Sequence, residues 1–156
     1  TYRAFLSCLE RSAKENQVAV PVFCFMPNHV HIVAQGTNEA SDIWRFMVAF
    51  KQYSGWWLKC NRPRFRWHRS FWDHLVRDES DLRNQVRYMI LNPVKGGLVA
   101  DWAAYPYVGA VGEELGGGVQ DVVCDILHRI WDNHNAGADV KSALTAEIFA
   151  RFLGDG

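Results

Sequence analysis

Two histidines separated by a single residue, His29 and His31, are the first side chains whose spacing points to chemistry. They lie in the segment HVHIVA (29–34), whose β-branched and apolar residues predict a strand. Residues i and i+2 of a strand point to the same face, so the two imidazoles are expected side by side, with Val30 turned to the core. Two neutral imidazoles suit a divalent metal and leave coordination positions open. The alternative is a polar outer face of an edge hairpin.

A tyrosine, Tyr88, is the second candidate. It lies in segment 79–91, which is predicted to form a helix that Pro93 stops. The apolar stripe of this helix consists of Leu82, Val86, Met89 and Ile90. Tyr88 falls opposite that stripe, on a face that it shares with three amides: Asn84, Gln85 and Asn92. A tyrosine hydroxyl, whose ordinary pKa is about 10, needs a metal or a base to attack effectively. The alternative is a half-exposed structural tyrosine.

The net charge of zero hides a strong asymmetry along the chain. Residues 45–78 carry eight Lys/Arg and two Asp, a net charge of +6, whereas residues 99–156 carry three basic and nine acidic residues, a net charge of −6. Such an asymmetry favours a polyanionic partner for the basic part, although a merely solvated basic loop is the alternative. The candidate nucleic-acid contacts in this segment are Lys51, Arg62, Arg64, Arg66 and Arg69.

Other features restrict the function less. Four cysteines without a CxxC pair argue against a disulfide framework and a zinc knuckle. We find neither a membrane span nor a signal peptide, so a cytoplasmic setting is expected. Aromatic residues make up 13% of the chain, with seven Trp, and serve either as core or as stacking platforms for unpaired bases. His74 lines the site or has a polar structural role.

The elements that must position these residues follow from the hydrophobic periodicity. We predict helices over 2–16, 39–58 and 79–91, a hairpin from 18–26 and 29–34 with a bulge or edge at Pro21, and a strand within 67–77. Residues 60–66 are expected to be a basic loop, 101–106 a surface turn and 112–118 a glycine-rich link. Two acidic helices are expected over 119–133 and 139–153. The fold class is α+β, a sandwich with an antiparallel sheet and helices on one face, followed by a C-terminal helical tail.

The segments FMPNHVHIV (25–33) and FWDHLVRDESDLRNQVRYMILNPVKGGLV (71–99) resemble the REP-associated tyrosine transposases, within the wider IS200/IS605-like Y1 transposase family. The resemblance implies a ferredoxin-like catalytic domain of the HUH/Y1 type over 1–107, with 108–156 as an acidic helical extension. It also implies that His29 and His31 bind Mg²⁺ or Mn²⁺ and that Asn92 is the third ligand. Tyr88 would attack DNA to form a 5′-phosphotyrosine intermediate.

The partner implied by the resemblance is single-stranded DNA that carries hairpins. The protein is expected to be a monomer or a homodimer, associated with a bacterial nucleoid and not with a membrane. Two departures stand out. The strand that precedes the first helix in relatives is either missing or cut off here, and its true absence would leave the sheet one strand short. Lys95-Gly96-Gly97 replaces the usual R-A-G. The alternative function is a REP or hairpin DNA-binding protein without turnover. An αβ RNA-binding domain would carry aromatic residues where this strand carries histidines.

Overall fold

A computed structural model describes residues 1–112, 115–135 and 144–152. Its centre is a six-stranded antiparallel sheet in the order β3-β6-β2-β1-β5, with β4 also paired to β6. The strands are β1 (Val18–Phe25), β2 (His29–Gly36), β3 (Phe65–Trp67), β4 (Trp72–Leu75), β5 (Val108–Gly109) and β6 (Leu144–Phe152). The helices are α1 (Tyr2–Asn16), α2 (Ile43–Asn61), α3 (Glu79–Lys95) and α4 (Val119–Asn135), with a short 3-10 turn at Trp102–Ala104. The α+β antiparallel class predicted from the sequence is confirmed.

The predicted hairpin is formed by β1 and β2, which pair from Val18↔Gly36 to Phe25↔Val30. The register shifts between Ala19 and Val22, so the expected bulge at Pro21 is present. A bulge adds one residue to one strand, which turns the side chains beyond it to the opposite faces. Val20 before the bulge and Phe23 beyond it therefore enter the same core.

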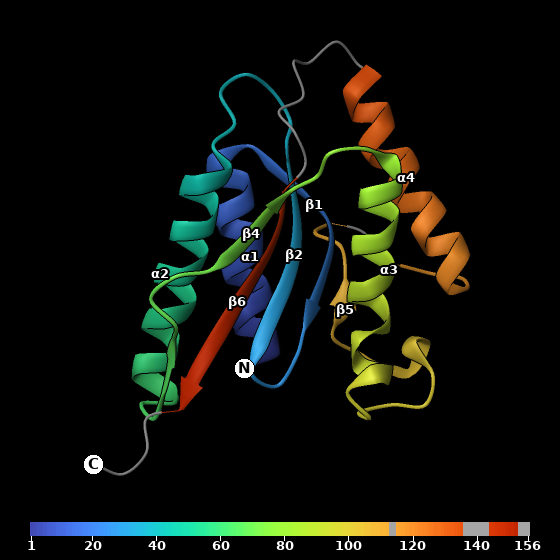
Figure 1. Ribbon diagram of the computed structural model, residues 1–156. Coiled ribbons are helices and arrows are strands. Elements are labelled where there is room, and N and C mark those ends of the chain that lie inside the picture. The colour runs from blue at the N-terminus through green and yellow to red at the C-terminus, as the bar shows by residue number, and fades with distance from the viewer. Residues whose placement is uncertain (113–114, 136–143, 153–156) are drawn as a thin grey trace.

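The strand β6 is the main correction to the predicted fold. We expected a helix over 139–153, but Leu144–Phe152 forms a strand; residues 136–143 and 153–156 lie outside the described part. β6 pairs with β2 along one side and with β4 and β3 along the other (Figure 1). β2 is therefore an interior strand, which excludes the edge-hairpin alternative for the two histidines. It has a paired strand on each side, β6 and β1.

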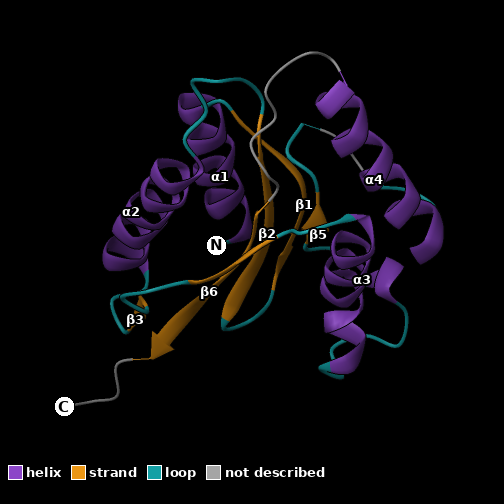
Figure 2. Cartoon of the chain, turned by 45° about the horizontal axis from the view of Figure 1, so that its top comes forward, coloured by secondary structure: helices purple, strands orange, loops and turns teal. Residues whose placement is uncertain are grey.

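Helices cover both faces of the sheet, not one as predicted (Figures 1 and 2). α1 and α2 pack on one face, where Phe5, Phe46 and Phe50 meet the β2 side chains of Val30 and Ile32. α3 and α4 pack on the other face, where they enclose Val33 of β2 together with Val22 and Cys24 of β1. The side chains of β2 thus alternate between two separate cores, as the pleat of a strand requires.

Two local predictions also need correction. α3 does not stop before Pro93 but continues to Lys95, and the proline ring is buried. The helix ends just beyond it, where the Gly96 N–H donates to the Asn92 carbonyl at 2.8 Å and the Leu98 N–H donates to the Pro93 carbonyl at 2.9 Å. The segment 101–106 is a turn with four exposed residues, as predicted, but Trp102 and Tyr105 within it are buried. The Tyr105 hydroxyl donates to the Phe25 carbonyl at 2.7 Å, which fixes this segment to β1.

The remaining elements follow the sequence closely. α2 begins at Ile43, four residues after the predicted start of 39–58, with Asp42 as its cap, and runs to Asn61. The basic loop is therefore shorter than expected, and β3 follows it. The strand predicted within 67–77 is β4, and the helix predicted over 119–133 is α4. β5 and β6 join the main sheet although both follow residue 107, so the sheet extends beyond the predicted catalytic region. No helix in the described ranges is long and apolar enough to cross a membrane.

Candidate functional site

The two histidines of β2 meet on the face of the sheet that α3 covers. Their Nε2 atoms lie 3.0 Å apart, and their ring planes are inclined at 83°. His31 is only 3% exposed, whereas His29 is half-buried at the end of the strand. Because Val30 between them points into the α1–α2 core, the predicted side-by-side arrangement of the imidazoles is confirmed.

The other nitrogen of each ring contacts a side-chain oxygen. Nδ1 of His29 lies 2.7 Å from Oδ1 of Asn28, and Nδ1 of His31 lies 3.0 Å from Oε1 of Glu147. Both oxygens can accept a hydrogen bond from a proton on Nδ1, which favours the tautomer that leaves the lone pair on Nε2. With both rings in this tautomer, the two Nε2 lone pairs face each other across 3.0 Å, and a cation between them would remove their repulsion. With the proton of one ring on Nε2, the same contact is a hydrogen bond between the two imidazoles.

A divalent cation fits this pair of nitrogen donors. Two ligands that occupy adjacent positions on an octahedral ion, each about 2.1 Å from the metal, are about 3.0 Å apart. Histidines that bind metals usually donate their second N–H to a carboxylate or an amide oxygen, as both do here. Within the described ranges no three His, Cys, Asp or Glu residues gather closely enough to bind a metal, so further ligands would be amide oxygens, water or phosphate.

Burial keeps both imidazoles in the neutral form that binds metals. It lowers the pKa of His31 to about 4, with a further contribution from neighbouring His29. Burial also lowers the pKa of His29, by removing water that would stabilise the charged ring. Burial also disfavours the negative charge of the Glu147 carboxylate, so it raises the pKa of that carboxyl.

Tyr88 lies on α3 directly opposite the histidine pair. The centroids of its ring and the His31 ring are 5.8 Å apart, with the planes at 90°. Its side chain is 46% exposed, while the apolar stripe of α3 is buried, so the predicted display of this tyrosine away from the core is confirmed. The Lys95 ammonium, two helical turns further on, lies 4.8 Å from the centre of the Tyr88 ring.

The three amides predicted near Tyr88 lie on the same helix with different exposure. Asn84 is exposed, whereas Gln85 and Asn92 are half-buried. The Asn92 backbone carbonyl accepts a hydrogen bond at the end of the helix, and its side chain follows Tyr88 by one turn. The role of Asn92 as a ligand stays a prediction.

His74 has a structural partner. Its Nε2 donates to Oδ2 of Asp81 at 2.8 Å, and the Arg77 backbone N–H donates to the same oxygen at 3.0 Å. This hydrogen bond from His74 is the largest cause of the lowered pKa of Asp81. Because Asp81 lies in the first turn of α3, His74 connects β4 to the start of the helix that carries Tyr88.

The predicted DNA-contact residues fall into two groups. The Lys51 ammonium donates to the backbone carbonyls of His68 and Arg69, both at 2.9 Å, and therefore holds the loop that precedes β4. Arg62, Arg64, Arg66 and Arg69 are exposed between the end of α2 and β4. Arg66 of β3 stands opposite Arg151 of β6, which adds positive charge to this edge.

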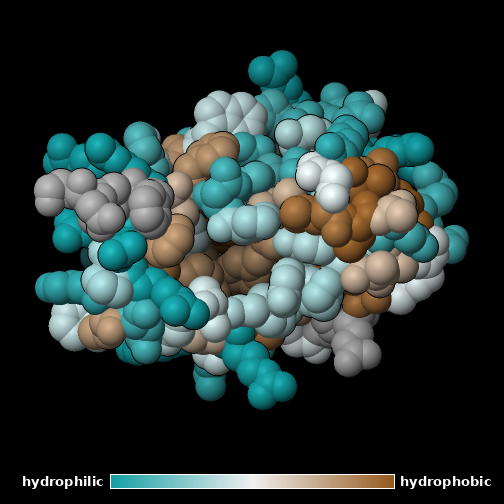
Figure 3. Space-filling view, turned by 90° about the horizontal axis from the view of Figure 1, so that it is seen from below, coloured by the Kyte–Doolittle hydropathy of each residue, from teal (hydrophilic) through white to brown (hydrophobic). Residues whose placement is uncertain are grey.

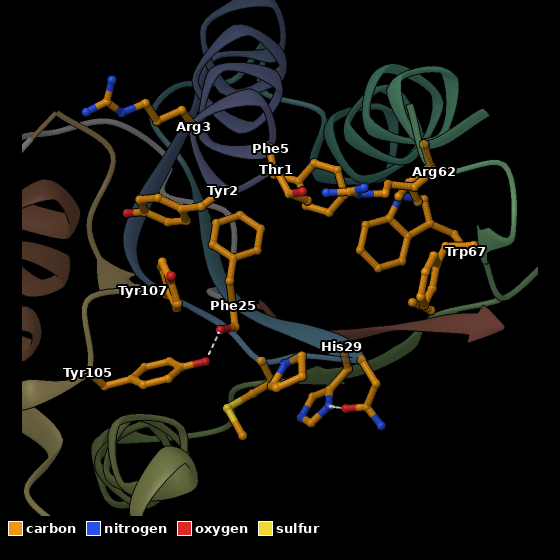
Figure 4. Close-up of a pocket in the computed structure, with 16 residues that line it drawn as sticks. Thr1, Tyr2, Arg3, Phe5, Phe25, His29, Arg62, Trp67, Tyr105 and Tyr107 are labelled. Carbon is orange, nitrogen blue, oxygen red and sulfur yellow. Dashed lines mark hydrogen bonds between the residues drawn. The ribbon is translucent and has the colours of Figure 1, made fainter. Parts of the chain in front are cut away.

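A cavity of about 790 Å³ opens beside His29 at the end of the molecule where β1 turns into β2. Seen from that end, the surface is hollowed, with an apolar floor and a more hydrophilic rim (Figure 3). Tyr2, Tyr107 and Phe25 lie on one side of the cavity, and Trp67 and Arg62 on the other, with His29 at its base (Figure 4). Aromatic and cationic groups therefore line a space that is continuous with the histidine site.

Three contacts of the site were missed at the sequence level: Lys95, Glu147 and Phe149. Lys95 follows Tyr88 by seven residues, a spacing that returns to the same helix face and could have identified it. Glu147 and Phe149 lie in the strand that was predicted as a helix. The apolar alternation of LTAEIFARF (144–152) has the period of a strand and was the available signal.

Comparison with known proteins agrees with this fold and site. The sequence model described as "Transposase IS200 like" matches residues 2–76. A provisionally named REP-associated tyrosine transposase of Haemophilus influenzae is 31% identical over 115 residues, which cover 66% of this chain and 65% of that protein. The REP-associated tyrosine transposase of Escherichia coli K12 is 25% identical over 109 residues, which cover 68% of this chain and 62% of that protein.

An α+β sheet that brings paired histidines to a tyrosine-bearing helix is thus found in a chain with transposase relatives. Residues 2–76 of the chain match the IS200-like transposase family, and the resemblance to REP-associated tyrosine transposases is confirmed. The chain spans somewhat less than two thirds of the length of these two relatives. No solved structure matches it.

Proposed function

We propose that this protein is a metal-dependent endonuclease and strand transferase that acts on single-stranded, hairpin-bearing DNA with Tyr88 as the nucleophile. The observation that carries the proposal is the approach of Tyr88 to His31, with ring centroids 5.8 Å apart, beside two Nε2 atoms that converge to 3.0 Å. A candidate nucleophile and a candidate cation site therefore share one face of the sheet. The names of the relatives, which are tyrosine transposases, support the same reading.

In this proposal His29 and His31 hold Mg²⁺ or Mn²⁺, with Asn92 as a third ligand from α3. The ion would supply positive charge to the non-bridging oxygens of the scissile phosphate. The structure supports the assignment through the chemistry of the donors, since burial lowers the pKa of both imidazoles and their Nε2 atoms lie 3.0 Å apart. Open coordination positions would be filled by water or phosphate.

The proposed cleavage step exchanges one phosphodiester bond for another. The Tyr88 phenol loses its proton to water, its oxygen bonds to phosphorus, and the bond from phosphorus to the 3′ oxygen breaks. The 3′ oxygen takes up a proton to give a free 3′-OH, and the downstream strand stays attached through a 5′-phosphotyrosine. Attack by another 3′-OH reverses the step and joins two strands. The Lys95 ammonium, 4.8 Å from the ring centre, would stabilise the phenolate.

The contacts of the other tyrosines support the choice of Tyr88. The Tyr53 hydroxyl donates to Glu15 at 2.6 Å, and the Tyr105 hydroxyl donates to a backbone carbonyl. Tyr2 and Tyr107 contact each other at the wall of the cavity, with ring centroids 4.9 Å apart and ring planes inclined at 51°. Tyr88 faces the histidine pair.

The surroundings of the site suit an unpaired strand. The arginines between α2 and β4 would attract phosphates, with an affinity that depends on salt. The cavity beside His29 offers aromatic faces on which unpaired bases stack, and its volume of about 790 Å³ is large enough for nucleotides. Arg62 and His29 both line this cavity.

The test is covalent capture of DNA. Hairpin-bearing single strands, labelled at either the 5′ or the 3′ end, are incubated with the protein and Mn²⁺ and separated by denaturing electrophoresis. We expect the 3′ label to shift with the protein and the 5′ label to appear in a shorter free strand. Tyr88→Phe should reduce the adduct at least about 10³-fold, because loss of a nucleophile removes the covalent route.

Tyr107→Phe is the matched control, since Tyr107 is 40% exposed and lines the neighbouring cavity. It should still form the adduct. An adduct that persists in Tyr88→Phe would show that another residue is the nucleophile. Hairpin binding by the wild-type protein without any adduct would favour the alternative, a DNA-binding protein without turnover.

A further inference from the structure

The histidine pair is enclosed by a strand from outside the region that matches the transposase family. The family match ends at residue 76, whereas β6 covers Leu144–Phe152. From this strand, the Glu147 carboxylate accepts from Nδ1 of His31 at 3.0 Å. The Phe149 ring stacks on the His29 ring, with centroids 5.2 Å apart and planes inclined at 27°.

The register of the sheet explains why these contacts occur together. In the antiparallel pair of β2 and β6, His31 stands opposite Glu147 and His29 stands opposite Phe149. Directly opposed residues of paired strands project to the same face, so each histidine has one β6 partner. The residues between them, Ala146 and Ile148, turn to the other face and are buried in the α1–α2 core. Burial of that apolar face fixes the register, because a slip by one residue would place Glu147 in the core.

The position of Glu147 has a consequence for the tautomer of His31. A carboxylate can only accept a hydrogen bond, so it places the imidazole proton on Nδ1. Nε2 then carries the lone pair, and it is Nε2 that lies 3.0 Å from Nε2 of His29. Without this acceptor, the proton is free to occupy Nε2, where it would block the position of a metal.

We propose that Glu147 is a positioning residue that fixes the tautomer and the orientation of His31, and that β6 is an integral part of the cation site. The effect on metal binding rests on the proposed function, whereas the effect on the tautomer does not. Glu147 contacts the nitrogen that faces away from the paired Nε2 atoms, so it acts through His31 and not as a ligand.

The first measurement uses the wild-type protein without metal. Two-bond ¹H–¹⁵N correlation spectra distinguish the two neutral tautomers of each histidine. We expect His31 to carry its proton on Nδ1, and a proton on Nε2 would overturn the proposal without any variant.

The second measurement uses Glu147→Gln, which keeps the shape but can offer an N–H to the ring. We expect His31 to shift toward the tautomer protonated at Nε2, and the affinity for Mn²⁺ in calorimetry to fall by roughly 10- to 100-fold. Thr145→Val is the matched control, because Thr145 lies on the same strand opposite Val33 of β2, away from His29 and His31; on its other side it pairs with His74 of β4, outside the histidine pair. It should leave both readouts unchanged.

A folded Glu147→Gln protein with the wild-type tautomer and the wild-type Mn²⁺ affinity would overturn the proposal. If the wild-type protein binds no Mn²⁺, the proposed metal function fails, and the tautomer spectra still decide the role of Glu147. If Glu147→Gln does not fold, the wild-type tautomer decides it.

Discussion

The two faces of the sheet share the strand β2 but differ in what they do with it. Toward α1 and α2, Val30, Ile32 and Ala34 enter a hydrophobic core. Two serines of these helices, Ser12 and Ser54, are also buried, and their hydroxyls donate to backbone carbonyls of their own helices. Toward α3 and α4, the same strand presents His29, His31 and Gln35, and only Val33 joins the apolar cluster. The side chains on one face of β2 therefore stabilise the fold, while the side chains on its other face include the groups that can do chemistry.

Two buried polar side chains of this face, His31 and Gln35, have a hydrogen-bond partner from another element, although Oε1 of Gln35 has none among the described residues. Glu147 of β6 accepts from His31, and the Gln35 amide donates to the Ile130 carbonyl of α4 at 3.2 Å. Buried polar groups cost free energy unless they are hydrogen-bonded, so these partners are a condition of the site. We therefore expect substitutions on the histidine face of β2 to change metal affinity, and substitutions on the α1–α2 face to change stability.

The largest expected effect is on metal binding. The double substitution His29→Ala/His31→Ala removes both nitrogen donors, and we expect calorimetry to show a loss of Mn²⁺ affinity greater than about 100-fold. The reason is that a cation bound between the two Nε2 atoms has no substitute donors among the described His, Cys, Asp and Glu residues. Wild-type affinity in the double variant would exclude this pair as the metal site.

A large effect on stability is expected from the other face. Ile32 is fully buried between α1 and α2, and Ile32→Ala should lower the free energy of unfolding by about 2–5 kcal/mol in urea denaturation. The folded variant should bind Mn²⁺ as the wild-type protein does, since the side chain points away from the histidines. Loss of metal affinity by a folded Ile32→Ala protein would mean that the two faces are coupled and that the comparison is wrong.

The parts of the site that depend on local periodicity were predictable from the sequence. The spacing of His29 and His31 gives their common face on a strand, and the helical wheel places Tyr88 opposite the apolar stripe. The approach of Tyr88 to His31 was not derivable from these patterns, because it depends on how α3 packs on the sheet. The family resemblance suggested that approach, and the structure has the two rings in contact distance.

The alternation of segment 144–152 indicates a strand, but the pairing of that strand with β2 could not be obtained from local periodicity. Ala and Glu in segment 144–152 are good helix formers, and local propensity favoured a helix. Pairing with β2, more than a hundred residues earlier in the chain, overrides that preference because it buries Ala146 and Ile148. Glu147 and Phe149 reach the site only through this long-range pairing, so no motif near the histidines could indicate them.

The smallest expected effect is on DNA binding at the basic edge of the sheet, where β3 pairs with β6. We expect the fourfold substitution of Arg62, Arg64, Arg66 and Arg69 by Ala to weaken binding of hairpin DNA and to leave Mn²⁺ affinity unchanged. Each phosphate contact removed should lower the slope of log K against log salt by roughly 0.7 for single strands, so the slope should fall by at most about 3.

Lys51→Ala sharpens this test within the same basic segment. The Lys51 ammonium is held by backbone carbonyls, and its burial lowers its pKa, so we expect its removal to change the salt slope less than removal of any one of the four arginines. Its loss should instead lower the melting temperature, because the loop before β4 loses its support. Fluorescence anisotropy of labelled hairpins over a salt series gives each slope. A folded fourfold variant with the wild-type slope would show that DNA binds at another surface. If Lys51→Ala changes the slope as much as loss of one arginine does, Lys51 contacts the DNA.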